Sequence, residues 1–184
     1  GGGKAVADIL FGKVSPSGKL PVTFYRNKAL QEMPEFTDYS MKNRTYRYYT
    51  GQPLYPFGYG LTYGDVVVTG VTADRNTAAV TVESRGSRAT EDVIQLYIKD
   101  QESSHAPVNP VLCGFQRVSL EPGEQKTVEV AINSSAFTVV NADGEHVPGS
   151  GSWTLYAHTG QPDARTARLT GKTAVQVSIP SEVE

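Results

Sequence analysis

The sequence predicts a mostly β protein in which an antiparallel β-sandwich follows a short α/β segment and a tyrosine-rich linker arm. Three observations predict this order. Apolar residues recur at helical spacing near the start of the chain, tyrosines crowd the segment from 25 to 63, and from about Asp65 apolar and polar residues alternate in short runs. Alternation with a period of two is typical of strands that bury one face.

The first 24 residues predict a helix, a turn and a strand. Val6, Ile9 and Leu10 fall at i, i+3 and i+4, so we expect a helix over residues 4–11, with Gly12 as its terminator, and no other helix in the chain.

Leu20, Val22 and Phe24 alternate as in a strand, and Pro21 places that strand at an edge or at a strand start. A single helix–turn–strand unit cannot bury both faces of a sheet. Residues 1–24 are therefore predicted to be the C-terminal remnant of an α/β-sandwich domain that needs a partner. We expect them to be weakly held.

Residues 25–64 are predicted to form an arm between two bodies. The segment from 25 to 63 has no clean period and holds eight of the chain's 10 tyrosines. Prolines and glycines interrupt any regular element, so we expect an extended arm with turns. These breakers are Pro34, Gly51, Pro53, Pro56, Gly58 and Gly60.

Residues 65–184 are predicted to form the sandwich and to fold on their own. Five runs place apolar residues on one strand face: Ala78/Val80/Val82, Ile94/Leu96/Ile98, Val128/Val130/Ile132, Trp153/Leu155/Ala157 and Val175/Val177/Ile179. Pro122-Gly123 and Asp143-Gly144 supply turns, the second in a hairpin setting. About seven short strands in this length indicate an immunoglobulin or fibronectin type III shape.

Composition excludes several functions. The 184 residues carry 17 Lys+Arg against 19 Asp+Glu, a formal charge of −2, which argues against nucleic acid or an anionic membrane as partner. No apolar run approaches the roughly 20 residues of a membrane span. The single cysteine, Cys113, cannot form an internal disulfide, and this leaves the compartment open.

Histidine and cysteine do not suggest a site. His105, His146 and His158 lie far apart without Cys or His at ligand spacing, so no metal and no cofactor is predicted. Cys113 lacks a neighbouring His or basic pair, which favours a buried apolar role over that of a nucleophile.

The carboxylates do not indicate a functional site either. Glycoside hydrolysis needs two carboxyl groups across a cleft, with one of them kept protonated. Glu121 with Glu124, and Asp143 with Glu145, lie around turns where both groups would be solvated and ionised. We therefore predict no catalytic residue in this chain.

The arm has two interpretations. Its tyrosines, with Arg44 and Arg47 among them, could stack on sugar rings and bind hydroxyls or carboxylates. Tyrosine also suits the packing of two domains, with its ring buried and its hydroxyl bonded, and we favour that interpretation. Two N-x-S/T sequons, at Asn43 and Asn133, matter only in a glycosylating pathway.

Long sequence segments of the chain resemble the C-terminal region of family 3 glycoside hydrolases, which include β-glucosidases and β-xylosidases. The N-terminal phrases are AVADILFG, PSGKLPVTF, DYSM, RTYRYY and PLYPFGYGLTY, and those further on are VIQLYIKD, GFQRVSLEPGEQKTVEV and GQPDARTARLTG. Residues 62–66 and 111–114 depart from the sequence that is usual in the family. We expect these departures to affect packing more than chemistry.

The resemblance implies that the nucleophilic Asp and the acid/base Glu lie in upstream domains, so neither role is carried to any position here. It implies a non-catalytic fragment of a retaining β-glycosidase acting on terminal β-linked glucose or xylose, with an accessory fibronectin type III-like domain. The alternative is a stand-alone β-sandwich binding module for a polysaccharide or a protein. Compartment and oligomeric state stay open.

Overall fold

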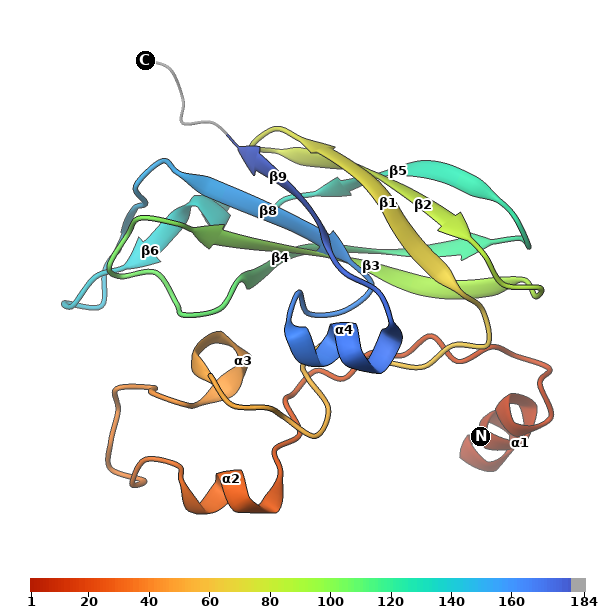
Figure 1. Ribbon diagram of the computed structural model, residues 1–184, viewed down its shortest axis with the longest axis horizontal. Coiled ribbons are helices and arrows are strands. Elements are labelled where there is room, and N and C mark those ends of the chain that lie inside the picture. The colour runs from red at the N-terminus through yellow and green to blue at the C-terminus, as the bar shows by residue number, and fades with distance from the viewer. Residues whose placement is uncertain (180–184) are drawn as a thin grey trace.

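Two antiparallel sheets pack face to face and form the sandwich (Figure 1). The computed structural model describes residues 1–179, so the last five residues of the predicted sandwich range lie outside the described residues. One sheet has the order β1-β2-β5, with β1 Val66–Ala73, β2 Thr77–Ser84 and β5 Gln125–Ala131. The other has the order β4-β3-β8-β9, with β4 Val111–Leu120, β3 Thr90–Asp100, β8 Trp153–His158 and β9 Val175–Ile179. The predicted mostly β sandwich is confirmed.

The core lies between these sheets and is built from the alternating apolar residues. β2 buries every second residue, and so does much of β3. Ile94, Leu96 and Leu155 are wholly inaccessible to solvent. Burial on this scale, about 25 cal/mol for each Å² of apolar surface removed from water, is the main force that holds the sandwich.

The predicted turns are present. Gly123 joins β4 to β5 with a φ of 74°, and Gly144 has a φ of 83°. Gly144 closes a small hairpin of β6 (Thr138–Val140) and β7 (His146–Pro148), which follows the 3₁₀ helix η1 (Ser134–Phe137). Glycine adopts a positive φ without the steric cost that a Cβ brings.

The N-terminal helix is confirmed, but the expectation of no other helix is wrong. α1 spans Gly2–Leu10, and the chain then turns at Gly12 with a φ of 69°. Three more α-helices are present in the described residues: α2 Asn27–Gln31, α3 Thr45–Tyr48 and α4 Ala164–Thr170.

Capping explains α4. The Asp163 side chain accepts a hydrogen bond from the Thr166 backbone N–H at 2.6 Å, and Gly171 ends the helix with a φ of 71°. These two caps satisfy backbone groups that a seven-residue helix would otherwise leave open at both ends.

The predicted strand at residues 20–24 is wrong. The segment makes one isolated bridge, between Phe24 and Tyr55, and Leu20 exchanges backbone hydrogen bonds with Tyr59 and Gly58. Pro21 lacks an N–H, and the facing segment turns too often to form a ladder. Residues 20–24 thus lie along the arm itself instead of entering a sheet.

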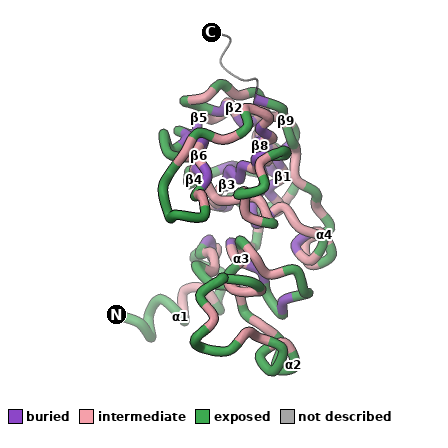
Figure 2. The backbone as a smooth tube through the Cα atoms, turned by 90° about the vertical axis from the view of Figure 1, so that its left-hand side faces the viewer, coloured by how far each residue is buried: buried purple, intermediate pink, exposed green. Residues whose placement is uncertain are grey.

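Residues 1–63 form a separate group beside the sandwich, and most of their backbone is exposed or half-buried, whereas the buried residues concentrate between the sheets (Figure 2). Within residues 1–179, no helix is long and apolar enough to cross a membrane.

Candidate functional site

An aromatic cluster joins the arm to the sandwich. Tyr46 of α3 stacks on Phe57, with ring centroids 4.1 Å apart and planes 11° apart. Both rings meet Tyr97 of β3 edge to face, at 6.3 and 6.5 Å. Offset stacking and edge-to-face contact each add to the burial of apolar area. These tyrosines therefore pack two parts of the molecule together.

Polar groups beneath the cluster complete the attachment. The Tyr97 hydroxyl donates to Gln95 Oε1 at 2.6 Å, and Gln95 Nε2 donates to the backbone oxygens of Gly58 at 2.9 Å and Thr159 at 3.2 Å. Burial raises the pKa of Tyr97 well above its ordinary value, so the hydroxyl stays a donor. A Cβ at Gly58 would lie 2.2 Å from Gln95 Oε1, which makes glycine necessary there.

Asn109 holds α3 against the strand edge. Its side-chain amide donates to the backbone oxygens of Tyr46 and Tyr49, both at 2.8 Å, and its backbone N–H donates to Arg47 O at 3.0 Å. The Tyr46 hydroxyl accepts from the Leu112 N–H of β4 at 3.0 Å. For Tyr46 the favoured packing interpretation therefore describes the observed contacts.

The segment after α1 is anchored by a buried ion pair. Lys19 Nζ lies 2.6 Å from Asp92 Oδ1, and the two side chains are 14% and 4% exposed. Nearby, the Ser15 hydroxyl lies 2.9 Å from that of Thr62 and 3.2 Å from that of Thr90. Residues 15–19 are thus tied to β3, so the expectation that residues 1–24 are weakly held is wrong for residues 15–19. For residues 1–14 it stays a prediction.

Residues 1–63 also expose many large apolar side chains. α1 buries none of its residues, and Leu10 is 75% exposed. A cavity of about 580 Å³ also opens beside Tyr25, Met41 and Tyr48. We call this exposed set the apolar face: Val6, Leu10, Phe11, Val14, Val22, Phe24, Leu30, Phe36, Tyr39, Met41, Leu54, Tyr55, Leu61 and Tyr63.

The arm is locally strained near this face. Met41, Asn43 and Thr45 have φ values of 61°, 57° and 56°, and for β-branched Thr45 such a value is an outlier. The Arg44 guanidinium donates to the backbone oxygens of Pro34 at 3.0 Å and Glu35 at 2.6 Å. Arg44 therefore holds the loop and does not join Arg47 in one site.

The two sequons are structured differently. Asn43 has the left-handed backbone described above, and its side chain accepts from Thr50. Asn133 caps η1, and its side chain accepts from the Ser135 N–H at 3.1 Å.

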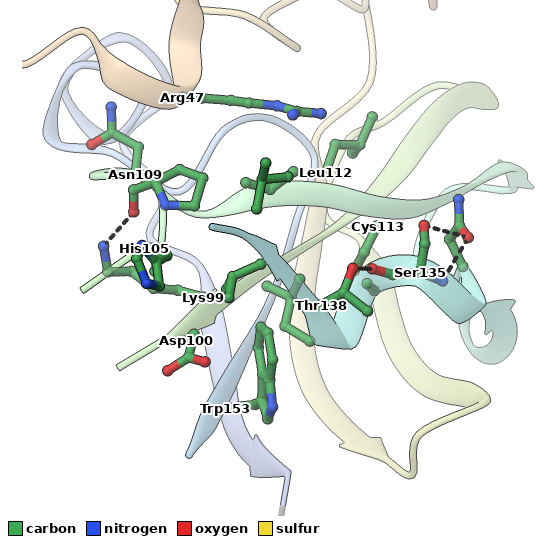
Figure 3. A pocket seen from close by; sticks show the side chains of 18 of the residues that line it. Arg47, Lys99, Asp100, His105, Asn109, Leu112, Cys113, Ser135, Thr138 and Trp153 are labelled. Atoms are coloured by element: carbon green, nitrogen blue, oxygen red, sulfur yellow. Dashed lines mark hydrogen bonds between the residues drawn. The ribbon is translucent and has the colours of Figure 1, made fainter. Parts of the chain in front are cut away.

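A second cavity, of about 210 Å³, lies where α3, the sandwich edge and the β6–β7 hairpin meet (Figure 3). Arg47 and Trp153 lie on opposite sides of it in this view, with Lys99, Leu112 and Thr138 between them.

Cys113 is one of the residues that line this cavity, and it is 6% exposed. Its burial raises the pKa of the thiol to about 12. A thiol with that pKa is protonated at neutral pH, so the interpretation of Cys113 as a buried apolar residue agrees with the structure.

The histidines do not converge on a metal site. His105, in the β3–β4 loop, and His146, on β7, both line the cavity in Figure 3, while His158 is buried on β8. Across residues 1–179, no group of three or more His, Cys, Asp or Glu side chains is placed to hold a metal ion.

The carboxylates considered from sequence lie at turns. Glu124 Oε2 accepts from the Glu121 N–H at 2.7 Å, and this bond holds the pKa of Glu124 below its ordinary value. Asp143 and Glu145 are exposed in the β6–β7 turn.

Sequence reasoning missed Asp163, the N-cap of α4. Burial raises the pKa of its carboxyl above the ordinary value, although the bond to the Thr166 N–H acts in the opposite direction. The signal that could have revealed its structural role was a capping residue three positions before a threonine and eight before Gly171.

Comparison with known proteins explains the two parts of the fold. Residues 1–63 match the glycosyl hydrolase family 3 C-terminal domain, and residues 92–161 match the fibronectin type III-like domain. The chain belongs to glycosyl hydrolase family 3 and corresponds to its C-terminal region. The resemblance seen in the sequence phrases is thereby confirmed.

Curated relatives of this family 3 chain are much longer than it. It is 37% identical to the xylan 1,4-β-xylosidase of Xylanibacter ruminicola over 148 residues, which are 77% of this chain and 17% of that protein. It is 35% identical to the periplasmic β-glucosidase of Salmonella typhimurium over 175 residues, 84% of this chain and 23% of that protein. The chain thus spans less than a quarter of either relative.

Solved structures of longer proteins match the fold of nearly the whole chain. A β-glucosidase from Streptomyces venezuelae, in complex with D-glucose, matches 96% of this chain and 24% of its own, with a TM-score of 0.77 and 26% identity. A family 3 exo-β-xylosidase matches 98% of this chain and 26% of its own, with a TM-score of 0.77 and 25% identity.

Proposed function

We propose that the chain is the non-catalytic C-terminal part of a retaining β-glycosidase that removes terminal β-linked glucose or xylose from oligosaccharides or glycosides. Family membership supports the reaction class, and relatives named β-xylosidase and β-glucosidase support the two sugars. The nucleophile and the acid/base group would belong to upstream domains of the same polypeptide.

The apolar face of residues 1–63 carries this proposal. Large exposed apolar patches mark interaction sites, and α1 buries none of its residues and exposes Val6 and Leu10, although the sandwich has a core of its own. In the proposed organisation, residues 1–24 close an α/β-sandwich domain, residues 25–64 are the arm, and residues 65–184 are an accessory sandwich.

The environment of the described carboxylates also supports chemistry outside the chain. A retaining glycosidase needs a nucleophilic carboxylate about 5 to 5.5 Å from a carboxylic acid kept protonated by its surroundings. The carboxyl group of Asp163 has a raised pKa, but this group already accepts the hydrogen bond that caps α4.

One observation favours the binding-module alternative. Phe36 and Tyr39 are 90% and 86% exposed in the arm, and such rings can stack on sugar faces. A stand-alone module would retain glycans by itself. Affinity electrophoresis of the chain in uncharged xylan or cellulose derivatives separates the two proposals, because the accessory role predicts no retardation.

Hydrolysis of aryl β-glucosides and aryl β-xylosides tests the main proposal. We expect nitrophenol release by the protein expressed with its upstream coding sequence and none by the 184-residue chain. Activity of the chain alone that is abolished by one Asp or Glu substitution would overturn the proposal.

A paired substitution tests the apolar face. Leu10→Asp, at a 75% exposed site on α1, is expected to leave the chain's melting temperature unchanged but to lower the activity and stability of the longer protein. Phe115→Asp, at a 67% exposed site on β4, is the matched control and is expected to change neither. Equal effects of both substitutions in the longer protein would argue against the apolar face as the docking surface.

A further inference from the structure

Basic side chains gather around the cavity of Figure 3. Arg47, Lys99, His105 and His146 line it from three separate parts of the chain: α3, the β3–β4 region and the β6–β7 hairpin. Asp100 is the acidic side chain among the described residues that line it. The lining therefore has more basic than acidic groups.

The Asp100 carboxylate is bonded mainly by backbone donors and, among the described residues, forms no ion pair with these basic side chains. It is 2% exposed and accepts from the N–H groups of Glu102 at 3.0 Å, Ser103 at 2.9 Å and Ser150 at 2.6 Å, and also from the Ser150 hydroxyl. A carboxylate with four donors is satisfied where it lies.

Two of the basic groups are bonded within the chain. Lys99 Nζ donates to the backbone oxygens of Pro107, at 2.9 Å, and Val108, and so holds the β3–β4 loop. His146 Nδ1 lies 3.1 Å from the Thr138 hydroxyl.

The other two basic groups keep unused donors. Among residues 1–179, neither the Arg47 guanidinium nor the His105 ring makes a hydrogen bond, and both residues are exposed. Arg47 is positioned by its backbone bond from Asn109 and lies 6.0 Å from the Tyr46 ring centroid. Its side chain extends across one side of the cavity (Figure 3).

The rest of the lining mixes apolar side chains, such as Leu112 and Val139, with polar ones, such as Asn109, Ser135 and Thr138. Leu112 lies below Arg47 in Figure 3, and Leu112 and Val139 both line the cavity; we call these two side chains its apolar wall. A volume of about 210 Å³ is small for a ligand site. A small ring with one anionic group would fit these features together. The ring would cover the apolar wall while the anion met the guanidinium.

We propose that this cavity binds a carboxylated sugar, a hexuronate, with its carboxylate on Arg47 and its ring against Leu112 and Val139. The planar guanidinium matches a carboxylate through two parallel hydrogen bonds, and His105 and Thr138 add polar side chains to the lining that ring hydroxyls would meet. The sugar part rests on the proposed glycosidase function, whereas the carboxylate part rests on Arg47 and His105.

Three probes separate the parts of this ligand. D-Glucuronate, D-glucose and acetate are titrated into the 184-residue chain at constant ionic strength, and binding is followed by amide chemical shifts in NMR. Glucose keeps the ring without the carboxylate, and acetate keeps the carboxylate without the ring. We expect glucuronate to shift the amides around Leu112 and to bind at least ten times more tightly than either of the others.

Arg47→Gln is the decisive variant, and Arg117→Gln is its control. Arg117, on β4, is exposed and outside the cavity, where it pairs with Glu91 at 2.6 Å. We expect Arg47→Gln to weaken glucuronate binding about tenfold or more and Arg117→Gln to leave it unchanged. Because Arg47 is exposed, its replacement leaves the core intact, and the unchanged remainder of the spectrum checks this.

Several results would overturn the proposal. These are no shift with millimolar glucuronate, equal binding of glucose or acetate, or equal affinity of Arg47→Gln and the parent chain. The titration involves no hydrolysis, so its failure and the failure of the glycosidase proposal are separate results.

Discussion

His158 makes the folding stability depend on pH. The side chain is 3% exposed, and burial, reinforced by the charges of Lys172 and Lys19, lowers its pKa from 6.5 to about 4. The unfolded chain therefore binds this proton more tightly than the folded chain does. It follows that the stability is complete above about pH 6.5 and is lost as the pH falls towards 4.

The size of the loss follows from the two pKa values. A difference between 6.5 and about 4, at about 1.36 kcal/mol for each pH unit, is worth about 3 kcal/mol. His158→Phe keeps a ring of similar shape without a titrating nitrogen. We expect the parent chain to lose about 3 kcal/mol more than this variant between about pH 7 and about pH 4.

Urea unfolding at several pH values measures this difference, because the variant shares every other titrating group with the parent. His146→Phe, on the exposed β7 hairpin, is the control for the loss of a histidine. Equal losses of stability in the parent and in His158→Phe would refute the reasoning.

Three further predictions concern the anchoring of the N-terminal segment and the buried thiol. Lys19→Ala leaves the Asp92 carboxylate buried without its partner, so we expect unfolding free energy to fall by about 3 kcal/mol; a loss below about 1 kcal/mol in urea unfolding would contradict this. Limited proteolysis is expected to trim residues 1–14 first, and protection of that segment would count against weak attachment. Cys113 is expected to react with Ellman's reagent only after unfolding, and rapid reaction of the native chain would contradict the raised pKa.

Strands with one buried face were predictable from the sequence, because alternation records burial directly. Ile94, Leu96 and Ile98 are buried as expected, and the Asp143-Gly144 turn closes its hairpin. Such local signals need no knowledge of the partner strand.

Elements held by caps or by irregular partners were not predicted. The seven residues of α4 show no apolar period, and the helix depends on Asp163 and Gly171 at its ends. The strand expected at residues 20–24 failed because alternation alone does not supply a regular partner, and its neighbour is the turn-rich arm.

The cavity in Figure 3 could not be predicted either. Arg47, His105 and His146 come from an arm, a loop and a hairpin that only the tertiary fold brings together. The buried pair of Lys19 and Asp92 has the same origin, since its members are remote in sequence.

Amide hydrogen exchange along α1 tests the central claim most directly, because that claim is that the apolar face packs against upstream domains. We predict that the amides of residues 2–10 exchange rapidly in the 184-residue chain and are protected about 100-fold or more in the protein that includes the upstream sequence. Equal exchange of these amides in the two proteins would contradict the account.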